Sequence, residues 1–193
     1  ISGVAPNVSM LHVRVLGAGG GSFNDVIDGI RWAAGLTTSW DGRPWSAFGL
    51  TDNAHPADVI NMSLGGGSSC WSTLQDAISQ ARAAGTVVVT AAGNSFRDAA
   101  NFTPANCNDT VTVAATGRVG GLANYSNFGS SIDIAAPGGD MSRDSGILST
   151  IGTGASTLTG YSYANYQGTS MAAPHVAGVA ALVASLHPTW GPS

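Results

Sequence analysis

One serine of the chain stands where a helix is expected to begin. Ser170 follows Gly168 and Thr169, and an apolar stretch then runs through Pro174 to Leu186. A glycine turn followed by such a stretch predicts a helix with the serine in its first turn. A serine in that place often does no more than cap the helix. Its hydroxyl can also attack a carbonyl when a base takes its proton, so both roles are open on these residues alone.

The elements that would position this serine follow from the hydrophobic pattern. Apolar, β-branched runs predict strands at residues 8–15, 59–63, 86–91, 110–115 and 132–135. One helix is predicted between Ser22 and Gly35, and a second from Ser72, where Gln75 completes a capping-box pattern. Residues 36–57 show no sustained period and are predicted to form a surface loop. Alternating strands and helices predict an α/β fold, with a mostly parallel twisted sheet and helices on both faces.

Loops of small residues are expected at one edge of this sheet. Ligands of parallel sheets bind at the carboxyl ends of the strands. Three such loops are predicted there. The first consists of Gly19, Gly20 and Gly21, the second runs from Ser63 to Gly66, and the third runs from Ala91 to Asn94. They either form a binding site or are ordinary strand-to-helix turns.

Several of these segments resemble one known family. The eleven residues from Gly168 to Gly178 resemble the nucleophile motif of the subtilisin-like serine proteases. Residues 61–66 (NMSLGG) are similar to the SLGG segment of that family, and residues 91–94 (AAGN) to its AAGN segment. Residues 3–32 resemble the part that follows the catalytic-histidine helix. The resemblance spans nearly the whole chain and implies a subtilisin-like three-layer architecture, with residues 1–193 as one partial catalytic domain, incomplete at both ends.

The resemblance also implies a role for each candidate site residue. Ser170 would be the nucleophile, and Asn94 would stabilise the oxyanion together with the backbone N–H of Ser170. Two walls of the primary specificity pocket would be formed by Ser63, Leu64, Gly65 and Gly66 and by Ala91, Ala92 and Gly93. Residues 101–104 would lie at its floor, and Gly19 to Gly21 would offer a strand edge to an extended substrate. These uncharged walls predict a broad-specificity endopeptidase that prefers a large apolar residue before the cut bond.

The acid and the base of such an enzyme are not found where the family places them. The family order is Asp, His, Ser. His12 falls in a predicted strand, His55 falls in the long loop, and His175 matches a structural position of the family. We therefore expect the catalytic Asp and His upstream of Ile1 and predict that residues 1–193 alone are inactive. The alternative is a non-catalytic subtilisin-like binding or scaffold protein. A lipase is disfavoured, because its Gly-x-Ser-x-Gly elbow would require glycine in place of Ala172.

The composition of the chain indicates which classes of partner it can bind. The chain has seven basic and eleven acidic residues in 193, with a net charge of -4, so no basic face for nucleic acid is expected. No apolar run is expected to approach the 18 or so residues that span a bilayer, which predicts no membrane association. We expect a secreted, extracellular monomer that binds polypeptide substrates and peptide-like inhibitors.

The cysteines and some of the acidic residues could stabilise the fold. Cys70 and Cys107 are either a structural disulfide of an oxidising compartment or two free thiols, and we predict the disulfide. The resemblance makes structural calcium possible, although no cofactor is required for the chemistry. Asp133, Asp140 and Asp144 are candidate oxygen donors, and their alternative role is that of solvated loop carboxylates.

Overall fold

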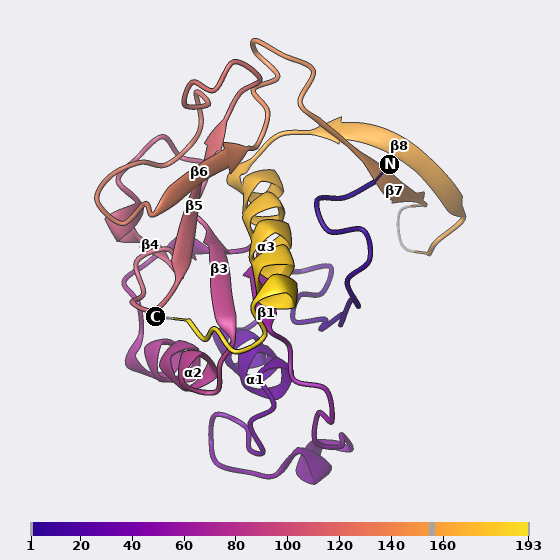
Figure 1. The fold of residues 1–193 in the computed structure, drawn as a ribbon, viewed down its shortest axis with the longest axis vertical. Coiled ribbons are helices and arrows are strands. Elements are labelled where there is room, and N and C mark those ends of the chain that lie inside the picture. Colours follow the sequence, from indigo (N-terminus) through magenta and orange to yellow (C-terminus); the bar gives the residue numbers. More distant parts are fainter. Residues whose placement is uncertain (1, 155–156, 193) are drawn as a thin grey trace.

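The computed structural model describes residues 2–154 and 157–192. Its centre is a parallel four-stranded sheet in the order β1-β3-β5-β6 (Figure 1). The strands are β1 (Val59–Met62), β3 (Val87–Ala91), β5 (Val111–Thr116) and β6 (Ile134–Pro137). Each neighbouring pair is parallel, as the strand and helix alternation predicted.

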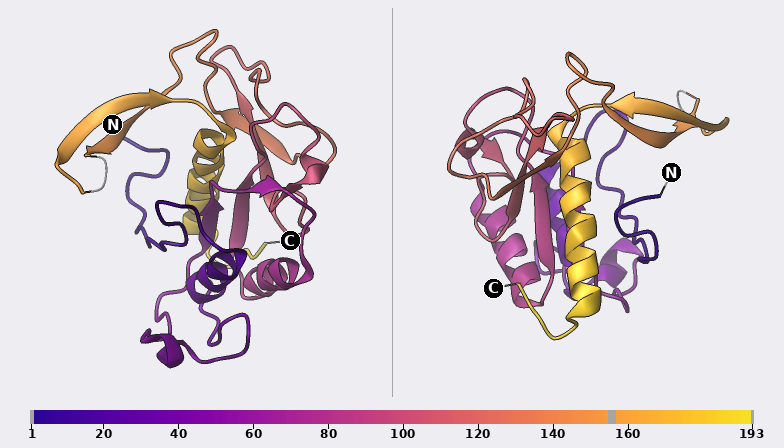
Figure 2. Two further views of the ribbon diagram at one scale, coloured as in Figure 1. Left: turned by 180° about the vertical axis from the view of Figure 1, so that it is seen from behind. Right: turned by 45° about the horizontal axis from the view of Figure 1, so that its top comes forward.

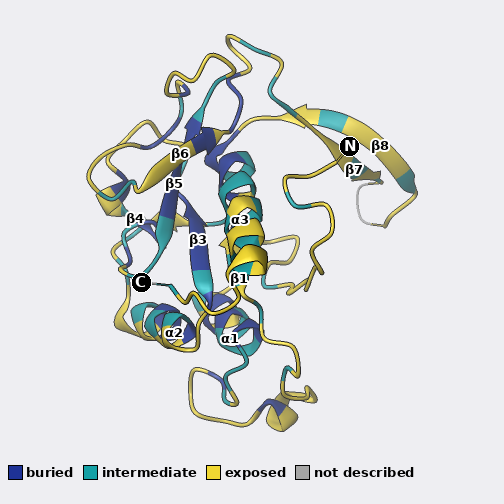
Figure 3. Ribbon diagram, in the orientation of Figure 1, coloured by how far each residue is buried: buried dark blue, intermediate teal, exposed yellow. Residues whose placement is uncertain are grey.

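Helices cover both faces of this sheet. Helices α1 (Phe23–Ala33) and α2 (Ser72–Ala83) pack on one face, and α3 (Thr169–Leu186) packs on the other (Figure 2). The two faces of β3 show this directly, because Val88 packs with α1 and α2 whereas Val89 packs with Ala172 and Ala173 of α3. The chain is therefore α/β with three layers. Figure 3 shows the buried residues concentrated along β3 and β5, between those layers.

The helix predicted between Ser22 and Gly35 is confirmed as α1, and Ser22 caps it. The Ser22 hydroxyl accepts a bond from the Asp25 N–H at 3.1 Å, and the Asp25 carboxylate accepts the Ser22 N–H at 3.3 Å. The capping box predicted for α2 was wrong. That helix has Trp71 at its N-cap without a side-chain bond, and Gln75 instead exchanges hydrogen bonds with the backbone of Asn108.

The strand predicted at residues 8–15 was also wrong. The segment has no regular secondary structure and pairs with none of the strands in the described ranges, and Met10 is 71% exposed. A β-branched composition favours an extended backbone, yet a strand forms only where a neighbour supplies the ladder of hydrogen bonds.

Smaller elements complete the fold. A long antiparallel hairpin of β7 (Ile147–Thr153) and β8 (Gly160–Tyr166) extends away from the sheet (Figures 1 and 2). Strands β2 (Gly66–Gly67) and β4 (Phe102–Thr103) form a short antiparallel pair. Two 3-10 turns, η1 (Trp45–Phe48) and η2 (Ala99–Asn101), lie in the connections. The predicted surface loop at residues 36–57 contains η1, whose Trp45 is buried.

Helix α3 corrects one expectation from composition. Its 18 residues have a mean hydropathy of 1.4, so by length and composition alone the helix could cross a membrane. The expectation that no apolar run approaches this length was wrong. In the structure the helix lies against the sheet, with Ala172 and Ala173 fully buried and Leu186 exposed near its far end.

The predicted disulfide is present. Cys70, just before α2, is bonded to Cys107, in the loop before β5, and their Cα atoms are 5.2 Å apart. Cys107 is buried in the core formed by α1 and α2. The bridge therefore ties α2 to the loop that leads into the sheet.

Candidate active site

The candidate site lies where the loops after β1 and β3 meet the first turn of α3. Ser170 is the second residue of α3 and is half-buried, whereas Thr169 before it is fully buried. Gly168 precedes the helix, and its N–H donates to the Gly138 carbonyl at 3.0 Å. The start of the helix is thus held by the chain that follows β6.

Asn94 is fixed to the start of this helix by its side-chain oxygen. Its Oδ1 accepts the Thr169 N–H at 2.8 Å and the Thr169 hydroxyl at 2.9 Å. Because a backbone N–H can only donate, the atom that faces Thr169 must be the oxygen. The amide nitrogen then lies on the side of Gly168, where it would be 3.5 Å from a Cβ placed on that glycine. Asn94 thus presents an uncharged donor beside the N-terminus of α3.

A second asparagine, which the sequence reasoning missed, shapes the loop that carries Asn94. Asn127 is fully buried; its Nδ2 donates to the Ala92 carbonyl at 2.8 Å, and its Oδ1 accepts the N–H groups of Ser95 and Arg97. Gly93 lies against it with a φ of 103°, a conformation that favours glycine. No local pattern could reveal this role, because the partners lie 30 to 35 residues away.

Ser63 joins the loop after β1 to the same helix turn. Its hydroxyl donates to the Ser170 carbonyl at 2.8 Å, and the Ser170 hydroxyl donates to the Ser63 carbonyl at 3.3 Å. Asn61 donates from Nδ2 to the Ser63 hydroxyl at 3.0 Å. The structure therefore brings Ser63, Asn94 and Ser170 together around the start of α3.

The segments predicted as walls and floor also lie together. Gly66 pairs with Thr103 across β2 and β4, and a Cβ on Gly65 would come within 2.6 Å of the Thr103 carbonyl. The Phe102 ring lies 3.5 Å from a Cβ built on Gly93 and 3.9 Å from one built on Gly67, so it borders both segments. Other wall side chains point into the core, and they are those of Leu64, Ala91 and Ala92.

Comparison with known proteins assigns the family. The subtilase family matches residues 1–193 in full. This chain is a subtilase.

Individual relatives agree with this assignment. An "Extracellular protease" of Xanthomonas campestris pv. campestris is 50% identical over 189 residues, which cover 98% of this chain and 30% of that protein. A solved structure described as proteases from Pseudoalteromonas arctica matches with a TM-score of 0.90 at 54% identity, covering 98% of this chain and 54% of the other. A "cold adapted subtilisin-like serine proteinase" matches with a TM-score of 0.72 at 37% identity, covering 98% and 58%. This subtilase chain therefore spans between about a third and somewhat more than half of these relatives.

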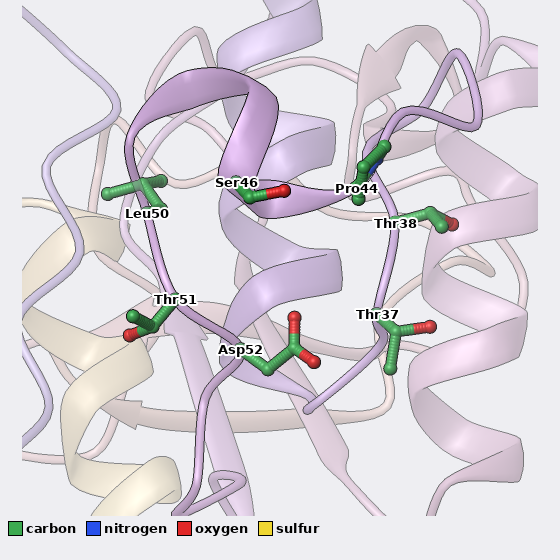
Figure 4. A pocket seen from close by; sticks show the side chains of 7 residues that line it. All are labelled: Thr37, Thr38, Pro44, Ser46, Leu50, Thr51 and Asp52. Carbon is green, nitrogen blue, oxygen red and sulfur yellow. The ribbon is translucent and has the colours of Figure 1, made fainter.

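The third predicted binding segment lies in the turn before α1. Gly17 and Gly20 exchange backbone hydrogen bonds of 2.7 and 3.2 Å, so the backbone of Gly20 is engaged within the turn. Gly20 and Gly21 line an open groove of about 560 Å³ together with Trp32 and other residues of α1 and of the loop after it. A separate pocket of about 690 Å³ lies wholly within residues 37–52 of the same loop, and Asp52 is its one charged side chain (Figure 4). None of the candidate catalytic residues lines either cavity.

None of the four histidines, all of which fall within the described residues, forms a hydrogen bond with the Ser170 hydroxyl. Nδ1 of His175 bonds the Met171 carbonyl at 2.8 Å within α3, and His187 stacks on Trp190 with ring centroids 3.6 Å apart. His12 lines the groove near Gly20, and His55 lies in the loop between α1 and β1. The Ser170 hydroxyl is bonded to the Ser63 carbonyl instead of an imidazole.

The proposed calcium donors serve another purpose. Asp144 accepts the N–H groups of Asp140, Gly146 and Arg118 at 2.7 to 2.9 Å, and these bonds, that of Asp140 first, lower its pKa. Asp140 bonds Ser142 and the Asn124 N–H, and its pKa is lowered chiefly by the Ser142 hydroxyl. Asp133 accepts the Thr112 N–H at 2.8 Å.

These carboxylates bind the loops in which they lie. Most of their oxygens already accept protein N–H or O–H groups. Within residues 2–154 and 157–192, no group of three or more His, Cys, Asp or Glu side chains could hold a metal ion. The structure thus shows no metal site formed by these three carboxylates within the described residues.

Tyr125 supports the turn that leads to Ser170. Its hydroxyl lies 3.0 Å from the Gly138 carbonyl and 2.6 Å from the Gly139 carbonyl. Burial raises the pKa of Tyr125 to about 12, so the hydroxyl stays protonated and donates. Since Gly138 in turn accepts the Gly168 N–H, Tyr125 fixes the backbone immediately before α3.

Proposed function

We propose that residues 1–193 belong to a single catalytic domain of a secreted serine endopeptidase, which cleaves peptide bonds through an acyl-enzyme on Ser170. The observation that carries this proposal is the fixed amide of Asn94 beside the N-terminus of α3, where Ser170 lies. Membership of the subtilases supports it. Secretion is supported by the relative from Xanthomonas campestris, which is named an extracellular protease.

The geometry suits attack on a carbonyl. The Ser170 oxygen would bond to the carbonyl carbon while a base takes its proton, and the carbonyl oxygen would become an oxyanion. The Ser170 N–H and the Asn94 Nδ2 would donate to that oxyanion. The proton would then pass to the leaving amine as the peptide bond breaks, and water would release the acyl group by the same steps in reverse.

The base and its acidic partner are proposed to come from parts of the protein outside residues 1–193. Two observations support this. The four histidines of the described residues lie away from the Ser170 hydroxyl or are engaged in other contacts. The relatives are also considerably longer than this chain.

Substrate preference follows from the slot between the loops. A Cβ built on Gly66 meets nothing within 4 Å, Phe102 supplies an aromatic edge beside Gly67 and Gly93, and none of these residues is charged. Such a slot favours a large apolar side chain before the cut bond. The proposed partners are polypeptides and peptide-like inhibitors, and the segment Gly19 to Gly21 remains the proposed place for the extended substrate.

The test is covalent labelling of the full-length protein with a fluorophosphonate, followed by peptide mapping. Only a serine activated by a base reacts quickly with this probe. We expect one adduct, on Ser170, and its loss in Ser170→Ala. Ser185→Ala, in the same helix, is the matched control and should label normally. A folded protein that binds peptides but forms no adduct would instead favour the non-catalytic binding role.

A further inference from the structure

Helix α3 contains a proline that breaks a specific hydrogen bond. In an α-helix the carbonyl of residue i accepts the N–H of residue i+4. For Ser170 that partner is residue 174, which is Pro174 and has no N–H. The carbonyl of the proposed nucleophile is therefore left without its helical donor, although it lies inside the helix.

A side chain from a distant part of the sequence donates to the Ser170 carbonyl in place of the missing N–H. The Ser63 hydroxyl, 107 residues earlier, donates to the Ser170 carbonyl at 2.8 Å. The direction of the bond is fixed, because a carbonyl can only accept. Asn61 donates from its Nδ2 to the Ser63 oxygen at 3.0 Å, which leaves the one hydroxyl hydrogen of Ser63 for Ser170. Asn61, Ser63 and Ser170 thus form a chain of hydrogen bonds with one polarity.

The next carbonyl of the helix also has a side-chain partner. The Met171 carbonyl, which is three residues before Pro174, lies 2.8 Å from Nδ1 of His175. The carbonyl again fixes the direction, so this nitrogen carries the proton. Side chains thus bond two successive carbonyls of this turn, and that of Ser170 is the one whose helical donor Pro174 removes.

Resting on the proposed function, we infer that Ser63 is a positioning residue whose hydroxyl substitutes for the N–H missing at Pro174 and fixes the peptide backbone of Ser170. The second contact of the pair supports this role. The Ser170 hydroxyl bonds the Ser63 carbonyl at 3.3 Å, a length typical of a weak bond that the base can replace. The 2.8 Å bond to the Ser170 carbonyl does not involve the reacting oxygen and can persist through the reaction.

The test is a double-mutant cycle in the full-length enzyme. Ser63→Ala should lower kcat about tenfold, the value expected for one neutral hydrogen bond, and should change KM less than about twofold. Ser63→Thr retains a hydroxyl and should keep at least half of kcat. Ser69→Ala, an exposed serine of the same loop, is the matched control.

The decisive variant is Ser63→Ala combined with Pro174→Ala. Alanine at 174 restores a backbone N–H that can reach the Ser170 carbonyl, so the double variant should recover most of the kcat lost in Ser63→Ala. A role of Ser63 in general packing, or in contact with substrate alone, predicts no recovery. An unchanged kcat in Ser63→Ala, or a double variant no better than the single one, would overturn the inference.

Two further readouts separate this inference from the proposed function. Fluorophosphonate labelling of the wild type at Ser170 tests the function itself, independently of Ser63. The melting temperatures of the wild type, Ser63→Ala, Pro174→Ala and the double variant test the hydrogen bond without any activity. The change Ser63→Ala should lower the melting temperature at least twice as much when residue 174 is proline as when it is alanine. Equal decreases would refute the idea that the Ser63 hydroxyl replaces the missing N–H, even in an inactive protein.

Discussion

Loss of the Cys70–Cys107 bridge is expected to destabilise the protein strongly. The bond joins residues 37 positions apart and therefore closes a loop of about 38 residues in the unfolded chain. Chain-entropy reasoning gives such a bridge about 4 kcal/mol at 25 °C. At the lower end of 2–4 °C per kcal/mol for a domain of this size, the melting temperature should fall by roughly 8 °C.

The assay compares three proteins in the Ser170→Ala background, which prevents self-digestion if the proposed function holds. They are the oxidised protein, the same protein reduced with excess dithiothreitol, and the double variant Cys70→Ala/Cys107→Ala. Reduction removes only the cross-link, whereas the variant also removes the buried Cys107 sulfur from the core of α1 and α2. The reduced protein should therefore show most of the shift and the variant slightly more.

A reduced protein that melts within about 2 °C of the oxidised one would refute this reasoning. It would mean that the loop between the two cysteines is already restricted in the unfolded chain. A large shift in the variant but not on reduction would assign the effect to packing around Cys107.

Three further predictions concern the loops around the site. The pKa of Asp144 is depressed in the folded protein, so its contribution to stability is present above the unfolded value of 3.8 and is lost as pH falls through the folded pKa. The difference in melting temperature between wild type and Asp144→Asn should therefore be large at pH 6 and shrink as the pH falls below 3.8. Tyr125→Phe removes the hydrogen bonds to the Gly138 and Gly139 carbonyls and should lower kcat severalfold. The decrease should be equal at pH 6 and pH 9, because a pKa of about 12 keeps the Tyr125 hydroxyl protonated at both values. Cleavage-site profiling of the full-length enzyme should show a large apolar residue before the cut bond, and a dominant preference for Arg or Lys would contradict the uncharged slot.

Local features of the fold could be predicted from the sequence. The cap at Ser22 and the buried stripes of the helices depend on residues within one or two turns, and the parallel strands carry apolar runs because both faces are covered. The hairpin of β7 and β8 gave no such signal, because most of its side chains are exposed and no alternation marks one face.

The parts of the site that could not be predicted depend on distant partners. Asn127 acts on residues 30 to 35 positions away, and Ser63 acts on a carbonyl 107 positions away. Proline at position 174 predicts that the helix lacks one backbone N–H donor, but only the structure shows which side chain replaces that donor. Residues 8–15 illustrate the converse, since their composition is that of a strand but they pair with none of the described strands.

The central claim is that Asn94 stabilises the oxyanion formed at Ser170, and the most direct test is kcat of the full-length Asn94→Asp enzyme. Aspartate retains an oxygen for the bonds to the Thr169 N–H and hydroxyl but replaces the donating Nδ2 with a second oxygen. We expect kcat to fall at least about 100- to 1,000-fold, the range known for removal of such a donor in subtilisin itself and taken from that relative, with little change in KM. A kcat near that of the wild type would remove Asn94 from the mechanism and contradict the proposed site.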